Sequence, residues 1–163
     1  MEKLIVILVS IVLVILDNSL VPFFSINGVY PSLLFTFAIA YSIINGREKA
    51  VFIGAISGIL QDLFFFYGFG VNSLLNLFLC IAASLIGENI FKSKRLIPVI
   101  STLILTILKY IGIFIIFYLL KIKMDFSKSL IMGIYNAIIM LLCYKLVMRI
   151  SNEEYKKRPW RFK

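Results

Sequence analysis

Three charged side chains stand inside strongly apolar stretches of the sequence, where a charge needs a chemical reason. Asp62 and Lys109 each lie about 18 Å along their stretch, and Asp17 lies about 20 Å along the first one, if each residue of a helix rises by about 1.5 Å. Ionisable residues inside lipid are costly, and they are usually paired or functional. The shared depth predicts that Asp62 and Lys109 form an ion pair, with Asp17 as the next candidate partner of Lys109.

Two asparagine side chains lie at a similar depth and, together with the three charged residues, define a polar layer. Asn76 and Asn136 fall at about 21–22 Å when the same helical rise is counted back from the inner ends of their stretches. One interpretation is that the layer is structural, with hydrogen bonds across helices that hold a bundle together. The other is that it forms a site for a small molecule or an ion. The predicted buried polar layer consists of Asp17, Asp62, Asn76, Lys109 and Asn136.

A glycine pattern precedes one of these acids. Gly54, Gly58 and Asp62 recur every four residues, so a helix would place them on one face. Small residues at this spacing let a neighbouring helix approach closely. This helix-packing or partner face could meet another helix of the same chain or a helix of a partner protein. The first is favoured, because Asp62 on the same face should be kept away from lipid.

Signatures of enzymes and of metal sites are missing from the sequence. There is no histidine, which removes the commonest zinc ligand and the usual base of a serine or cysteine nucleophile. Cys80 and Cys143 have no CxxC partner, and they read as small apolar residues. The segment GAISG does not match the GxSG of rhomboid proteases, and Gly58 and Asp62 do not form the GxGD of intramembrane aspartyl proteases. We therefore expect a protein without catalytic, cofactor-binding or metal-binding residues.

Six apolar stretches are available to position the polar layer. Of the 163 residues, 61% are apolar, and the mean hydropathy of +1.02 is too high for a water-soluble domain of this size. Because lipid cannot satisfy backbone polar groups, the stretches are predicted to be transmembrane helices. The second one is the shortest, so it could also be a re-entrant segment. The predicted fold is an all-α integral membrane bundle over 1–150, with spans at about 4–24, 29–45, 50–66, 71–91, 97–120 and 127–150.

Basic residues are distributed unevenly between the two ends of these spans. With the N-terminus inside, twelve basic residues fall in inner segments, and only Lys121, Lys123 and Lys128 fall in outer ones. This bias predicts that both termini are cytoplasmic. The tail, 151–163, is predicted to lie on anionic lipid headgroups, or alternatively to dock on a cytoplasmic partner. No nucleic-acid-binding module is present. The predicted headgroup-binding residues are Lys156, Lys157, Arg158, Trp160 and Arg161.

Short motifs in the second and third stretches carry a family resemblance. Pro31-Ser32-Leu33-Leu34 opens the second stretch. The glycine-rich run from Gly54 to Asp62 resembles a pattern ending in G-L-x-x-D, with Ile59 at the leucine, and Gly68-Phe69-Gly70-Val71-Asn72 resembles the glycine-containing turn that follows. In these features the chain resembles the MreD family of rod-shape-determining membrane proteins over nearly its whole length.

The resemblance implies a non-enzymatic component of the bacterial cell-elongation machinery in the cytoplasmic membrane. Such a protein would bind the scaffold protein MreC and other elongation-complex membrane proteins, and help couple MreB filaments to peptidoglycan synthesis. The alternative is a substrate-binding S-component of an energy-coupling-factor vitamin transporter, a group with a similar fold and an outward-facing pocket for a small molecule. The outer loops are short and the only tryptophan lies in the tail, which argues against the transporter.

The charge bias makes a topological prediction. Single cysteines introduced at Glu48 and Ser151 should resist a membrane-impermeant maleimide in intact cells, because both positions are expected inside. A cysteine at Asp125 should be labelled. Labelling of the Ser151 position from outside would remove one span from the predicted topology.

Overall fold

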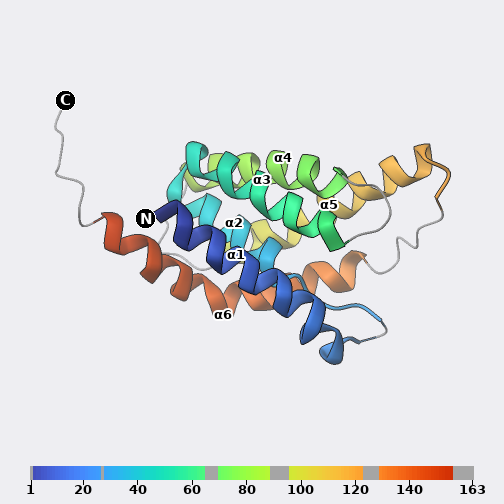
Figure 1. The fold of residues 1–163 in the computed structure, drawn as a ribbon, viewed down its shortest axis with the longest axis horizontal. Helices are drawn as coiled ribbons and strands as arrows, with labels where there is room; N and C mark the ends of the chain where they lie inside the picture. Colours follow the sequence, from blue (N-terminus) through green and yellow to red (C-terminus); the bar gives the residue numbers. More distant parts are fainter. Residues whose placement is uncertain (1, 27, 65–69, 89–95, 123–128, 156–163) are drawn as a thin grey trace.

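A computed structural model of the chain describes residues 2–26, 28–64, 70–88, 96–122 and 129–155. Within these ranges the regular elements are helices, with one isolated bridge between Ile26 and Val29 and no β-strand, so the prediction of an all-α fold is confirmed. Figure 1 shows the helices aligned roughly along one long axis. They are α1 (Glu2–Ser19), the 3-10 helix η1 (Val21–Phe24), α2 (Leu33–Asn45), α3 (Arg47–Phe64), α4 (Val71–Glu88), α5 (Leu96–Leu119) and α6 (Ser129–Tyr155).

Three of the described helices are long and apolar enough to cross a membrane. They are α4, α5 and the segment Ser129–Arg149 of α6, with mean hydropathies of 1.6, 2.3 and 2.0. The helices α1 and α3 both contain 18 residues, but they carry more charged residues, three in α1 and four in α3. The helix α2 is apolar but contains only 13 residues. It begins at Leu33 rather than at 29, because Ser32 has extended backbone angles and forms the N-cap, with its side chain accepting from the Phe35 amide.

The short helix α2 forms the centre of the bundle. It contacts every other described α-helix, and nearly all of its side chains are buried, from Leu34 to Ile44. By contrast, α1 buries only the narrow face that carries Val6, Ser10, Val14 and Asp17, and its other side chains are exposed or half-buried. The apolar surface that remains exposed on the outer helices suits contact with lipid tails, so the bundle needs polar contacts inside to fix its arrangement.

The helix α4 fills the glycine groove of α3. A Cβ atom built on Gly54 would lie 2.9 Å from Leu77 Cα, and one on Gly58 would overlap Ser73 Cα. Both distances are too short for any side chain, so these glycines are required for the close approach of the two helices. The same holds for Gly87 of α4, where a Cβ would overlap the Ile43 carbonyl oxygen of α2. The helices α2, α3 and α4 therefore pack backbone against backbone.

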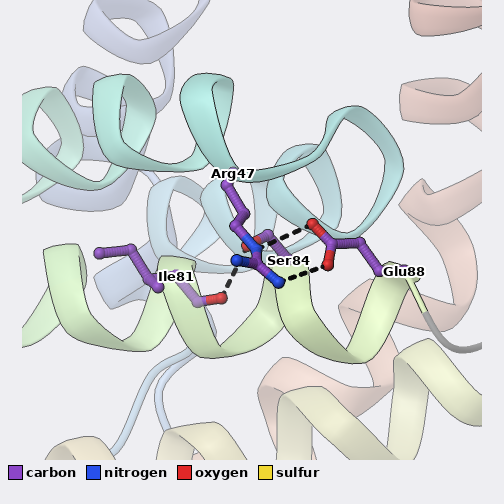
Figure 2. Close-up of polar contacts among 4 residues, drawn as sticks. All are labelled: Arg47, Ile81, Ser84 and Glu88. Atoms are coloured by element: carbon purple, nitrogen blue, oxygen red, sulfur yellow. Dashed lines mark hydrogen bonds and ion pairs between the residues drawn. The ribbon is translucent and has the colours of Figure 1, made fainter.

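A bidentate ion pair joins the start of α3 to the end of α4. The Arg47 guanidinium donates to the Glu88 carboxylate through Nε at 3.0 Å and through its terminal nitrogen at 2.8 Å. Figure 2 shows this fork, next to the bond from Ser84 Oγ to the Ile81 carbonyl. Both charged side chains are largely exposed, so the pair contributes at most about 1 kcal/mol. It gives Glu88 a partner that the sequence did not reveal.

Candidate functional site

The structure buries all five residues of the predicted polar layer. Their exposed fractions are 8% for Asp17, 2% for Asp62, 0% for Asn76, 6% for Lys109 and 1% for Asn136. Four of them belong to one hydrogen-bonded network that joins all six α-helices, and Asp62 belongs to a separate one. Each network is organised around the N-terminus of a helix.

The first network starts where Asp17 of α1 meets the N-terminus of α2. Asp17 Oδ1 accepts from the Leu33 amide at 2.7 Å, and Oδ2 accepts from the Leu34 amide and from Ser32 Oγ, both at 3.1 Å. The first amides of a helix have no partner within the helix, and the helix dipole favours a negative charge there. The carboxylate and the helix start therefore satisfy each other in the interior of the bundle.

Ser32 is the residue through which four helices are connected. Its amide donates to Asn136 Oδ1 of α6 at 2.9 Å, and its hydroxyl accepts from Gln61 Nε2 of α3 at 2.9 Å. The same hydroxyl caps α2 by accepting from the Phe35 amide at 3.2 Å. Asn136 Nδ2 in turn donates to Thr106 Oγ1 of α5 at 3.2 Å. The start of α2 is thus tied to α1, α3 and α6 directly and to α5 through Asn136.

Gln61 extends the network to α4 and to the buried cation. Its Oε1 accepts from Lys109 Nζ of α5 at 2.6 Å and from Asn76 Nδ2 of α4 at 2.9 Å. Lys109 Nζ also lies 4.5 Å from the centroid of the Phe35 ring, within the range of a cation–π contact. One neutral amide side chain therefore connects α2, α4 and α5 to α3.

Asp62 does not form the predicted ion pair with Lys109. It accepts from the amides of Asn72 and Ser73, both at 2.9 Å, and from Ser73 Oγ at 2.5 Å. These groups form the N-terminus of α4, so Asp62 caps α4 as Asp17 caps α2. The prediction was wrong because equal depth does not place two residues on facing sides of their helices. The neighbouring Gln61 is the residue on α3 that reaches Lys109.

Ser32, Gln61 and Thr106 were missed because the predicted layer took only charged residues and asparagines from the apolar stretches. A signal did exist for Ser32, since a serine after a proline and directly before an apolar run is a typical N-cap. For Gln61, its position inside an apolar stretch was the only sign. Thr106 makes a bond from Oγ1 to the Thr102 carbonyl at 2.7 Å, as threonines commonly do inside helices.

A cavity of about 280 Å³ adjoins the first network. Asp17, Ser32, Gln61 and Lys109 lie in its wall, so the network is also the polar part of a concave surface. Among the described residues there is no group of three or more side chains suited to a metal ion. The cavity is suited to binding a small molecule, and the network in its wall is suited to holding the helices together. The remaining lining residues are Val14, Asn18, Gly28, Val29, Tyr30, Pro31, Phe64, Val71, Asn72, Tyr110, Ile113, Phe117 and Met132.

Comparison with known proteins gives one finding. The family model described as rod shape-determining protein MreD matches residues 1–151. No curated protein and no solved structure matches the chain.

The bond between Gln61 and Lys109 can be tested by a double-mutant cycle. Gln61→Leu and Lys109→Met should couple by about 1.5–3 kcal/mol in the free energy of unfolding, because Gln61→Leu leaves the buried ammonium without the acceptor of its charged hydrogen bond and Lys109→Met removes that ammonium. The cycle of Asp62→Ala and Lys109→Met serves as the control, and its two effects should add to within about 0.5 kcal/mol. Unfolding in mixed micelles would measure both. Strong coupling in the control alone would restore the ion pair and refute the described network.

Proposed function

Because the chain belongs to the family of the rod shape-determining protein MreD, we propose that it binds MreC and helps couple MreB filaments to peptidoglycan synthesis. The observation that carries this proposal is the extent of the match, which covers residues 1–151 and with them nearly the whole helical bundle. The family's role is in rod shape determination, and the resemblance in the sequence is thereby confirmed. The match also favours this role over the S-component alternative.

The internal bonding supports a non-enzymatic, structural role. Asp17 and Asp62 each accept bonds from the start of a helix, and Gln61 joins three other helices to α3. Carboxylates held in this way have a structural role, because their lone pairs already accept hydrogen bonds from backbone amides. The polar layer would then hold the bundle in one arrangement, and the outer surface of the helices would be free for partners.

We propose that the bundle is a multi-pass protein of the bacterial cytoplasmic membrane with six crossings and cytoplasmic termini. The uneven distribution of basic residues supports this orientation. The acids of α1 and α3 are compatible with crossings, because helix N-termini compensate them inside the bundle. Under this topology the two capped helix starts lie in the outer half of the membrane, and the basic tail meets anionic lipids on the inner side.

The glycine face of α3 bears on where MreC would dock. The groove at Gly54 and Gly58 is occupied by α4, so the span of MreC is proposed to bind an outer face of the bundle instead. Gly58→Leu should therefore lower the amount of folded protein, because a side chain there collides with the α4 backbone. An abundant, monodisperse Gly58→Leu protein that fails to retain MreC would place MreC in this groove and contradict the internal packing.

The proposed function predicts that MreC co-purifies with the chain. Affinity-tagged protein extracted in mild detergent should retain MreC, whereas a tagged unrelated membrane protein of similar size should not. Depletion of the chain in a rod-shaped host should produce round cells, which re-expression should restore. Normal rods after depletion, together with no retained MreC, would refute the proposal.

A further inference from the structure

Lys109 is a buried cation without a carboxylate partner among the described residues. It is 6% exposed, and its Nζ donates to the neutral Gln61 Oε1 at 2.6 Å. The ion pair found in the described part of the chain is that of Arg47 and Glu88. It joins the start of α3 to the end of α4 and does not involve Lys109. A charge inside a spanning helix normally faces a countercharge, another polar group or a water-filled cavity.

The two acids predicted as partners of Lys109, Asp17 and Asp62, accept hydrogen bonds from other groups instead. Asp17 accepts three bonds at the start of α2, and Asp62 accepts three at the start of α4. In each case the helix N-terminus supplies the positive partner of the carboxylate. Neither carboxylate lies within ion-pair distance of Lys109, so the described part of the chain places no anion beside this lysine.

The unmatched ammonium lies in the wall of the cavity. A volume of about 280 Å³ is close to the lower end of the range for small-molecule sites, which starts at roughly 300 Å³. An ammonium group has three donors, and one is used by Gln61. Four aromatic rings also line the space, those of Tyr30, Phe64, Tyr110 and Phe117. The wall thus combines the Lys109 ammonium with a mainly apolar surface, and the Asp17 carboxylate in the same wall is already bonded to the start of α2.

We infer that this cavity binds a small amphipathic anion, whose carboxylate or phosphate group pairs with Lys109 while its apolar body packs against the aromatic rings. The ligand supplies the countercharge that the described part of the bundle lacks. Such an anion has two possible sources, a lipid whose headgroup enters the cavity and a free small molecule. The inference goes beyond the role in rod shape, and it does not require MreC.

The test uses two matched pairs of probes on the full-length protein purified in a neutral detergent. Phenyl phosphate is compared with phenol, and dihexanoyl phosphatidate is compared with dihexanoylglycerol. The readout is the temperature at which half of the protein leaves the monodisperse peak after heating. Each anion should raise this temperature by more than its uncharged partner if it binds the folded state.

Three variants identify the site. Lys109→Met should weaken the binding of the anion by about 10- to 100-fold, as expected for loss of a charged hydrogen bond. Lys145→Met is the matched control, because Lys145 is an exposed lysine of a spanning helix and does not line the cavity. Ile113→Trp fills the cavity and leaves Lys109 in place, so it should abolish binding even if Lys109→Met fails to fold.

The outcomes separate the sources of the ligand and decide the inference. A shift with phenyl phosphate that Ile113→Trp removes, and that Lys109→Met also removes where this variant folds, supports a free small anion. A shift with phosphatidate alone, removed by the same variants, supports a lipid headgroup. The inference is overturned if neither anion exceeds its uncharged partner, or if the shift persists in Ile113→Trp or in a folded Lys109→Met protein.

Discussion

The capping of α2 by Asp17 is the interaction on which the rest of the bundle depends. Helix α2 starts inside the bundle, where its first amides have no preceding turn of helix to bond to. Asp17 accepts from two of these amides, and Ser32 accepts from a third. Without these acceptors several donors would be left unsatisfied in a medium that cannot replace them. A short central helix with a buried start is possible because α1 delivers a carboxylate to that point.

The same device occurs a second time along the chain. Asp62, near the end of α3, accepts from the amides that open α4, just as Asp17 near the end of α1 accepts from those that open α2. In each pair an acid at the end of one helix caps the helix that follows. This repeated use explains why two carboxylates are buried in an apolar bundle. It also leaves Lys109 as the cation that neither acid balances, which is the basis of the proposed anion site.

The sequence predicted the kind of fold better than it predicted the contacts of individual residues. Apolar length and helical spacing indicated an all-α bundle, and both are properties of one segment at a time. The ion pair of Asp62 and Lys109 was wrong because it required the rotation of two helices about their axes, which depth does not determine. The bond from Gln61 to Lys109 and the close contact of Gly87 with Ile43 depend on the same rotations. These could be found only once the helices were placed together.

Hydrogen exchange at the start of α2 tests the central role of Asp17 most directly. In lipid nanodiscs, Asp17→Ala should speed the exchange of the Leu33 and Leu34 amides by about 2- to 30-fold, the factor expected for loss of a helix cap. Asn18→Ala is the control, because among the described residues Asn18 Nδ2 donates only to the Val14 carbonyl within α1 and makes no bond to α2. Unchanged protection of both amides in a folded Asp17→Ala protein would show that the start of α2 does not depend on this carboxylate, and would contradict the account.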